Sequence, residues 1–327
     1  MPVTTPGIEI EVHLGPDEWE RSLRAEALAG LTGDPKILAP TWLYDERGCD
    51  LFDQITRLPE YYPTRAERSI LLRRARDVAE RSGADTLVEI GAGTAEKTRI
   101  LLDAMALHGR LTRYVPFDVA ESTLRSTADA VSTEHPDIRV EGVVGDFRQH
   151  LGELPRGGRR LIAFLGGTIG NLDPHDRAEM LATIAGGMVA GDSFLLGTDL
   201  VKDRGRLVAA YDDAAGVTAA FNKNVLQVLN DQLDADFDLD RFDHVARFDE
   251  DHEWIEMRLR SRDDQTVQIR ALGITLQFAD GEDLRTEISA KFRPERVRAE
   301  LAAAGLELVE WWTDDDGDFA LSLAVRR

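Results

Sequence analysis

The chain has 327 residues, and 39 Lys and Arg against 60 Asp and Glu give it a formal charge of −21. That balance argues against binding to nucleic-acid phosphates or to an anionic membrane surface, because both interactions depend on clustered positive charge. The hydrophobic fraction of 43% is typical of a folded protein, and the longest apolar runs fall far short of the ~20 residues of a spanning helix. We therefore expect a small-molecule partner, no nucleic acid and no membrane.

The N-terminus lacks the basic start and apolar core of a secretory signal, and Cys49 is the only cysteine. A single cysteine forms no internal disulfide, so the cytoplasm is the expected compartment. We expect a monomer. Residues 1–20 mix Pro, Gly and acids without a sustained period, and we interpret them as an extended lead-in.

Apolar strand-like runs alternate with amphipathic helical stretches from Thr86 onward. This alternation predicts an α/β fold, with a parallel sheet and helices on both of its faces. The predicted strands are residues 86–90, 114–118, 140–147, 161–166 and 193–199.

The alternation of predicted strands and helices ends at Asp199, where a different domain is predicted to begin. A helix over 205–229 and an acidic segment over 231–253 precede β-rich stretches that no helix separates: 254–260, 267–278 and 284–292. Consecutive strands of this kind are typical of an antiparallel unit. The C-terminal residues then predict a helix over 294–304 and a hairpin, 308–313 with 319–325, that could return to the first sheet.

Residues 86–98 read as a buried strand, a turn with Gly91 and Gly93, and a helix. Glycines in such a turn let the backbone approach a ligand, and the helix start offers unpaired N–H groups. The dinucleotide fingerprint and the phosphate loop both require another glycine where Glu96 stands, although the Lys-Thr pair that follows fits the phosphate loop. A carboxylate at that place is expected to repel phosphates.

S-adenosylmethionine (SAM) carries no phosphate, and the pattern of its methyltransferases recurs here at three successive strand ends. Glu89 lies two positions before the first glycine, Asp118 ends the next strand, where the ribose hydroxyls bind, and Asp146 with Phe147 follows the third, beside the adenine. Each acid alone is more often a helix cap, but the three in order predict SAM. A nicotinamide enzyme and a noncatalytic nucleotide-binding module are the alternatives. The predicted cofactor-binding residues are Gly91, Gly93, Lys97, Asp118, Asp146 and Phe147.

Four segments resemble the bacterial L-histidine Nα-methyltransferases of ergothioneine biosynthesis: LFDQITRLPEYYPT (51–64), FLGGTIGNL (164–172), GTDLVK (197–202) and TEISAKF (286–292). The resemblance runs from about residue 25 to the end of the chain. It implies SAM-dependent trimethylation of the α-amine of free L-histidine, through the mono- and dimethyl forms, to hercynine, with S-adenosylhomocysteine as the second product. This reaction is the first step of ergothioneine biosynthesis.

The resemblance also implies a domain organisation. Residues 62–200 and 288–327 would form the Rossmann-like sheet of a class I SAM-dependent methyltransferase. Residues 1–61 and 201–287 would form a second, smaller α+β domain that closes over histidine.

The same resemblance implies roles for individual residues. Asn171 corresponds to the asparagine that holds the substrate amine, and Tyr61 to the tyrosine that reaches the imidazole directly or through water; these two are the predicted catalytic residues. Tyr211 and Tyr44 correspond to the hydroxyls that bind the α-carboxylate. Thr218, seven residues after Tyr211 on the same predicted helix face, could line the pocket. Without the resemblance, each of these residues would be read as a turn or packing residue.

Glu287 and Ser289 are the specificity pair that the resemblance implies. Residues i and i+2 of a strand point to one face, so both side chains can meet the same imidazole edge. Met257 would pack beside the ring as an adaptable apolar wall. An exposed polar strand face and an ordinary core methionine are the alternatives for these three positions.

Methyl transfer from a sulfonium is an in-line displacement that needs alignment and exclusion of water, and no covalent intermediate. The seven histidines show no metal-ligand spacing, so no metal is expected. Methylation of another amino acid or small amine is the rival among enzymes. A noncatalytic sensor of the cofactor or of histidine is the rival from another class.

Overall fold

The computed structural model describes residues 7–326, which divide into two compact units. Unit 1 contains residues 7–15, 65–200 and 292–326, and unit 2 contains residues 16–64 and 201–291. Within the described residues, none of the helices combines the length and the apolar composition that crossing a bilayer requires.

Unit 1 is built on an eight-stranded sheet, and the predicted α/β fold class is confirmed. The strand order is β1-β5-β4-β3-β6-β7-β14-β13, parallel from β1 to β7, with β14 antiparallel to β7 and β13 antiparallel to β14. The strands are β1 (Ile8–Val12), β3 (Thr86–Ile90), β4 (Arg113–Asp118), β5 (Arg139–Val144), β6 (Arg160–Phe164), β7 (Ser193–Asp199), β13 (Leu306–Thr313) and β14 (Phe319–Arg326). The C-terminal hairpin therefore does return to this sheet.

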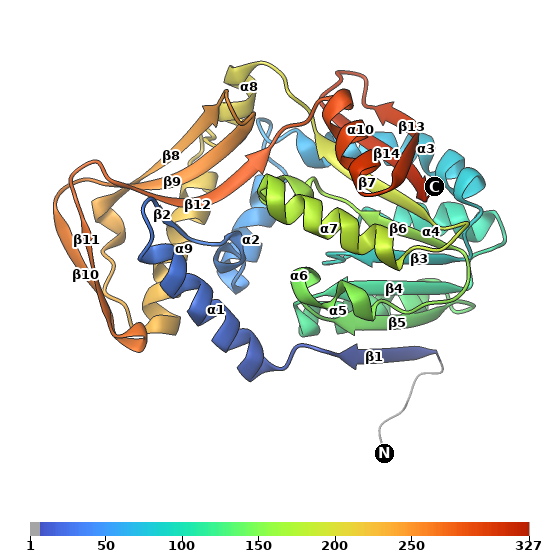
Figure 1. The fold of residues 1–327 in the computed structure, drawn as a ribbon, viewed down its shortest axis with the longest axis horizontal. Coiled ribbons are helices and arrows are strands. Elements are labelled where there is room, and N and C mark those ends of the chain that lie inside the picture. Colours follow the sequence, from blue (N-terminus) through green and yellow to red (C-terminus); the bar gives the residue numbers. More distant parts are fainter. Residues whose placement is uncertain (1–6, 327) are drawn as a thin grey trace. The chain divides into compact units, whose positions relative to one another are not determined.

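Helices flank the sheet on both faces (Figure 1). The helical elements of unit 1 are α3 (Pro63–Ser82), α4 (Thr98–Leu107), α5 (Glu121–Glu134), α6 (Phe147–His150), η2 (Leu151–Glu153), η3 (Thr168–Asn171), α7 (Pro174–Gly187) and α10 (Pro294–Ala303). Buried residues of α3, α4 and α5 form one apolar core with every second residue of the central strands, for example Leu87, Tyr114 and Leu161. The central strands are buried on both faces, which explains why they are mainly apolar.

The N-terminal segment corrects two predictions. Residues 1–20 were predicted to be an extended lead-in, and residues 1–61 to lie in the second domain. Ile8–Val12 instead forms β1, which pairs in parallel with β5 at the edge of the unit 1 sheet (Figure 1), and α1 begins at Pro16. Backbone pairing with β5 satisfies the N–H and C=O groups that an unpaired segment would leave to water. The lead-in predicted for residues 1–6 lies outside the described residues.

Unit 2 contains a four-stranded sheet in the order β2-β12-β9-β8 and a separate hairpin of β10 and β11 (Figure 1). The strands are β2 (Lys36–Ile37), β8 (Phe242–Asp249), β9 (Trp254–Ser261), β10 (Gln265–Ile269), β11 (Ile274–Phe278) and β12 (Asp283–Ala290). The predicted antiparallel unit is confirmed for β8, β9 and β12, whereas β2 pairs with β12 in parallel. The helical elements are α1 (Pro16–Leu31), η1 (Pro40–Leu43), α2 (Glu46–Ile55), α8 (Arg204–Ala209), α9 (Val217–Leu233), η4 (Leu239–Arg241) and η5 (Arg270–Leu272).

Three predicted elements differ from those observed. The helix over 205–229 is two helices, α8 and α9, because Gly216 has a φ of 74° and Asp213 accepts the backbone N–H groups of Val217 and Thr218 at the start of α9. The strand over 140–147 ends at Val144, since Asp146 caps α6. The stretch 267–278 is the β10–β11 hairpin, turned by η5.

A bulge in β12 decides which side chains share a face of the unit 2 sheet. Arg285 pairs with Arg258, but Glu287 pairs with Met257, so two residues of β12 oppose one residue of β9. Strict alternation from Leu284 would bring Thr286 to the face of Met257; the extra residue brings Glu287 there instead.

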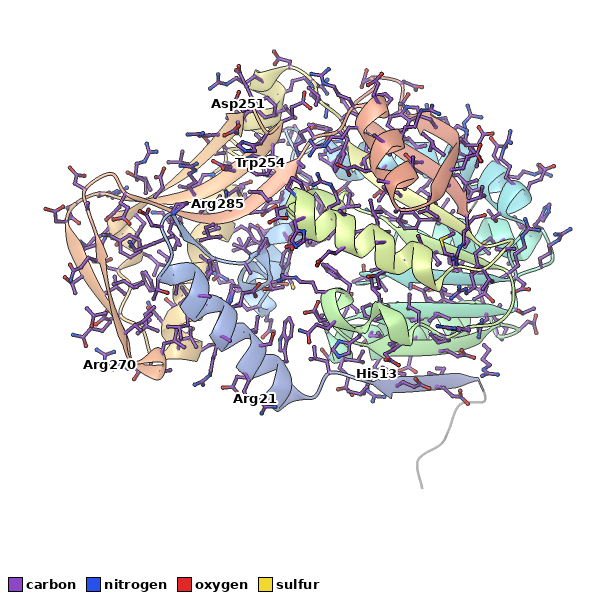
Figure 2. The ribbon with its side chains drawn as sticks, in the orientation of Figure 1. His13, Arg21, Asp251, Trp254, Arg270 and Arg285 are labelled. Atoms are coloured by element: carbon purple, nitrogen blue, oxygen red, sulfur yellow. The ribbon has the colours of Figure 1, made fainter. Side chains whose placement is uncertain are left out.

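The opposite face of this sheet is polar and aromatic. The Arg285 guanidinium lies 5.9 Å from the ring centroid of Trp254, and Figure 2 shows these two labelled side chains on neighbouring strands. Glu256 and Asp283 accept hydrogen bonds from Arg258 on the same face.

Candidate active site

The glycine loop after β3 has the backbone conformation that a closely approaching ligand requires. Gly91 and Gly93 have φ values of 71° and 48°, and a Cβ atom at either position would meet no atom within 4 Å. Positive φ values favour glycine, and the open space beside both residues leaves room for a ligand against the backbone. The N–H groups of Gly91 and Ala92 both donate to the carbonyl of Phe117, which ties the loop to the end of β4.

Asp118 lies at the end of β4 and holds the same loop. Its Oδ2 accepts the N–H of Gly93 at 2.8 Å, and its Oδ1 accepts the N–H of Ala120 at 2.9 Å. A carboxylate has about four lone-pair sites, so these two bonds leave acceptor capacity for the two hydroxyls of a ribose. The residues therefore fit SAM at this strand end.

Glu89 is buried beneath the loop. Thr98 donates to its Oε1, and the hydroxyl of Tyr114 donates to its Oε2 at 2.6 Å. Burial raises the pKa of Glu89 to about 7, although the two hydroxyl donors act in the opposite direction. Its hydroxyl partners lie on α4 and β4, so Glu89 joins these two elements behind the loop.

The end of β5 follows directly beside Asp118, whose carbonyl accepts the N–H of Gly145 at 3.0 Å. Asp146 caps α6 by accepting the N–H of Arg148 at 2.9 Å, and it is 7% exposed. The ring of Phe147 lies 6.0 Å from that of Phe164. The structure thus brings together Gly91, Gly93, Asp118 and the segment of Asp146 and Phe147 within unit 1.

Lys97 forms an ion pair with Glu67, a residue that sequence reasoning missed. Glu67 lies on α3, is fully buried, and accepts the N–H of Gly166 through both carboxylate oxygens, at 2.8 and 3.0 Å. It therefore ties the residue before α4 to the end of β6. The sequence contains no signal for this, because Glu67 lies in a helix with other charged residues and its partners are 30 and 99 positions away.

Asn171 ends η3, directly after β6, where the sequence predicted it. The element starts from Gly167, whose φ is 70°, and Asn171 is half-buried. Asn171 belongs to unit 1, whereas the other predicted substrate-binding residues belong to unit 2. Its role toward the substrate amine stays a prediction.

In unit 2 the structure brings the three predicted tyrosines together. The rings of Tyr61 and Tyr211 lie 6.3 Å apart, edge to face, and the ring of Phe52 lies 5.6 Å from that of Tyr44 and 6.1 Å from that of Tyr61. Tyr44 is 43% exposed, yet loss of solvation, and next the charge of Glu287, raise the pKa of its phenol well above the usual value of 10.0. The Tyr44 hydroxyl therefore stays protonated and can donate a hydrogen bond.

Glu287, Ser289 and Met257 share one face of the unit 2 sheet. Glu287 lies directly opposite Met257 on β9, and Ser289 lies opposite Ile255. Glu287 and Ser289 are 8% and 7% exposed, so the pair is not an exposed polar strand face. Met257, which is 2% exposed, belongs to the apolar core of unit 2 and flanks this pair.

Lys291 extends this face, and sequence reasoning missed it as well. It follows the last residue of β12 and is fully buried, and its Nζ donates to Tyr211 at 2.9 Å and to Ser289 at 2.8 Å. Its position, i+4 from Glu287, was a usable signal, because a strand continued by one residue places Glu287, Ser289 and Lys291 on the same face.

Thr218 and Tyr211 do not share a helix face, which corrects the prediction. Tyr211 lies in the connection between α8 and α9, whereas Thr218 lies in the first turn of α9, where Asp213 accepts its N–H at 2.7 Å. The connection is anchored by His244, whose Nε2 bonds the carbonyl of Tyr211 at 2.8 Å.

His244 is held in turn by Asn222, whose Nδ2 lies 2.9 Å from its Nδ1. Asn222 is fully buried and accepts the hydroxyl of Thr286 at 2.5 Å, so the bulge of β12 and the segment of Tyr211 are joined by one hydrogen-bonded chain. Burial lowers the pKa of His244, and a neutral ring matches its roles as acceptor and donor in this chain.

Residues 23–326 match the family described as "Histidine-specific methyltransferase, SAM-dependent". The histidine N-alpha-methyltransferase of Mycolicibacterium smegmatis is 59% identical over 314 residues, which cover 96% of this chain and 98% of that protein. The enzyme of the same name from Mycobacterium tuberculosis is 56% identical over 98% of this chain and 99% of its own. Ergothioneine biosynthesis protein 1 of Schizosaccharomyces pombe is 29% identical over 97% of this chain and 41% of that protein. The chain therefore belongs to the family of histidine-specific, SAM-dependent methyltransferases.

Proposed function

We propose that this enzyme methylates the α-amine of free L-histidine three times, through the mono- and dimethyl forms, to hercynine, the first step of ergothioneine biosynthesis. The observation that carries the choice of histidine is the pair Glu287 and Ser289, which are buried on one strand face with Met257 opposite Glu287. A carboxylate acceptor and a hydroxyl beside an apolar wall match the edge of an imidazole. Family membership at 56–59% identity to enzymes named for this reaction supports the same reading.

SAM supplies an electrophilic methyl group on a sulfonium. Gly91 and Gly93 leave the backbone open to it, Asp118 retains acceptor capacity for its ribose, and Asp146 with Phe147 would border its adenine. Lys97, paired with Glu67, stands at the start of α4 beside the same loop. These roles rest on positions at three adjacent strand ends, where ligands of open α/β sheets bind.

The amine must be presented without its proton and with its lone pair directed at the methyl. Asn171 can hold the amine laterally through its amide, and Tyr61 can pass the proton to water. In-line displacement then depends on alignment more than on acid–base strength. The phenol of Tyr44 stays protonated, so Tyr44 can donate a hydrogen bond to the α-carboxylate and fix the substrate while its nitrogen turns between transfers.

Replacement of Asn171 tests this arrangement. Asn171→Ala should lower kcat by at least tenfold and leave the affinity for SAM within about twofold, because the amide orients the amine only. Steady-state kinetics and isothermal titration measure the two quantities. Wild-type turnover in this variant would remove Asn171 from the reaction.

Mass spectrometry of one incubation with histidine and SAM tests the proposed function itself. The expected products are mono-, di- and trimethylhistidine in succession, with release of S-adenosylhomocysteine. Binding of histidine without that release would identify a noncatalytic sensor. Preferred turnover of another amino acid in a parallel panel would identify the rival enzyme activity.

The finer expectations on partners and location form part of the proposal. The charge of −21 supports the absence of nucleic-acid binding, and the single cysteine supports the cytoplasm. That the enzyme is a monomer stays a prediction. Sedimentation equilibrium, a filter-binding assay with duplex DNA, and fractionation of the producing cells are the measurements. A stable dimer, DNA retention or secretion would each contradict the corresponding expectation.

A further inference from the structure

Three polar side chains in unit 2 form a closed triangle. The Nζ of Lys291 lies 2.9 Å from the hydroxyl of Tyr211 and 2.8 Å from that of Ser289, and the two hydroxyl oxygens lie 2.7 Å apart. All three residues are buried, Lys291 completely. The ammonium also lies 4.7 Å from the ring centroid of Tyr211.

The triangle determines the direction of its hydrogen bonds. An ammonium group only donates, so both hydroxyl oxygens accept from Lys291. One of the two hydroxyls must then donate its proton to the other across the 2.7 Å contact. The two hydroxyls together therefore have at most one proton left to donate to a further group. That group would meet a hydrogen-bond donor next to the positive charge of Lys291.

Glu287 has the opposite character on the same sheet face. An ionised carboxylate only accepts hydrogen bonds, and Glu287 precedes Ser289 by two residues on β12. The face thus presents an acceptor and, next to it, a donor. A neutral imidazole has one N–H donor and one unprotonated nitrogen, whereas an imidazolium has two donors and a charge that Lys291 repels.

We propose that Lys291 is a positioning residue that makes the site select the neutral imidazole of histidine. It does so by holding Ser289 as the donor toward the unprotonated ring nitrogen, while the hydroxyl of Tyr211 donates to Ser289. This inference rests on the proposed function, since it deepens the recognition of histidine. Lys291 is not placed in contact with the substrate; it acts on the substrate through these two hydroxyls.

Other ionisable groups lie around the triangle. They are Glu287 on β12, the phenols of Tyr44 and Tyr61, and His244 on β8, which reaches the carbonyl of Tyr211 and has Asp212 and Asp213 nearby. The phenol of Tyr44 remains protonated, and burial lowers the pKa of His244, which keeps that ring neutral. Glu287 is the carboxylate of this set that lies on the same strand face as Ser289.

The test is the protonation state of bound histidine, read by nitrogen NMR of ring-labelled L-histidine at pH 7 on the full-length enzyme with S-adenosylhomocysteine. The wild type should show one protonated and one unprotonated ring nitrogen. Lys291→Met should bind histidine at least tenfold more weakly and show two protonated nitrogens, because Glu287 then acts alone. Lys291→Arg, which keeps charge and donors, should recover the neutral ring.

Two further variants make the outcome decisive. Ser289→Ala breaks the triangle while retaining the lysine, and should also lose the neutral ring, which keeps the proposal testable if Lys291→Met does not fold. Lys202→Met is the matched control, because Lys202 donates to Tyr62 at 2.6 Å in the same unit, outside the triangle; it should leave the ring signals unchanged.

An imidazolium in the wild type, or a neutral ring with unchanged affinity in Lys291→Met, would overturn the inference. If the wild type does methylate histidine while the Lys291 variants behave normally, only this inference fails. If the wild type neither binds nor methylates histidine, the proposed function is wrong, and the inference that rests on it is wrong with it.

Discussion

Asp118 shows how one side chain can shape a loop and still offer a binding site. Its two oxygens hold the N–H groups of Gly93 and Ala120, at 2.8 and 2.9 Å, and each oxygen keeps a lone pair. An asparagine would keep one acceptor oxygen only. The carboxylate is therefore suited both to fix the glycine loop and to receive ribose hydroxyls.

Asp118→Ala should weaken SAM binding by about 1 to 3 kcal/mol, because the ribose loses a charged acceptor and Gly93 loses its anchor. The SAM affinity of Asp118→Asn should fall between those of Asp118→Ala and the wild type. Isothermal titration with SAM measures the change. Unchanged affinity in the alanine variant would place the ribose elsewhere.

Glu287 faces Met257 directly, so these two residues should act together on the choice of substrate side chain. Glu287→Ala removes a charge-assisted hydrogen bond and should lower the kcat/KM for histidine by tenfold or more, about 1.5 to 3 kcal/mol. The freed volume and the lost anion should raise the kcat/KM for tryptophan relative to histidine, and further when Met257→Val is added.

The ratio of kcat/KM for histidine and tryptophan in the wild type and both variants measures this effect. Glu250→Gln, at an exposed ion pair with Arg204, is the control and should leave the ratio unchanged. A ratio that is the same in all of these proteins would remove Glu287 from the substrate site.

At the scale of elements, α3 is joined to the sheet of unit 1 by Glu67. One buried carboxylate accepts the N–H of Gly166 after β6 and pairs with Lys97 at the start of α4. A Cβ atom on Gly197 of β7 would lie 2.3 Å from Oε1 of Glu67, so this strand must carry glycine where the carboxylate passes. One buried carboxylate therefore joins α3 to the end of β6 and to the start of α4.

Glu67→Gln should weaken SAM binding about tenfold and lower stability by about 1 to 3 kcal/mol. The amide still accepts the N–H of Gly166 but leaves the charge of Lys97 without its counterion. Titration with SAM and urea unfolding give the two quantities.

Asp315→Asn is the control for Glu67, because it breaks the exposed pair of Asp315 with Arg73 of the same helix. It should change neither quantity. A loss of stability in Glu67→Gln with normal SAM affinity would give Glu67 a structural role alone.

At the scale of the whole molecule, the excess of carboxylates makes stability depend on pH, and Glu89 is one identifiable source. Its pKa is about 7 in the folded protein, against 4.5 for the ordinary carboxyl group. Between those values the folded state binds more protons than the unfolded state. Stability from this group therefore falls as the pH rises from 4.5 through 7, by an amount on the order of 3 kcal/mol.

Glu89→Gln should remove that dependence, since a neutral amide is not penalised by burial at high pH. Its free energy of unfolding relative to the wild type should rise progressively between pH 5 and pH 8, as measured by urea unfolding without ligand. For Glu153→Gln, at an exposed position of η2, the free energy of unfolding should change with pH as it does in the wild type. A constant offset between Glu89→Gln and the wild type would contradict the shifted pKa.

Local features of the chain determined the fold class and much of the cofactor part of the candidate site. Central strands that are buried on both faces are mainly apolar, so the runs in β3, β6 and β7 were visible in the sequence. Acids that follow successive parallel strands must meet at one edge of the sheet. The position of Asp118 and Asp146 at this edge was therefore predictable from their order along the chain.

The tertiary structure decided what depends on register and on distant partners. The bulge that turns Glu287 toward Met257 and the pairing of β1 with β5 both depend on backbone hydrogen bonds between strands that are far apart in the chain. The break that separates Tyr211 from Thr218 is local, because Gly216 and the Asp213 cap start a new helix. The buried ion pair of Glu67 and the triangle of Lys291 join residues 30 and 80 positions apart. Hydrophobic periodicity reports which face of an element is buried, but a polar side chain acquires its partner only when packing brings the two together.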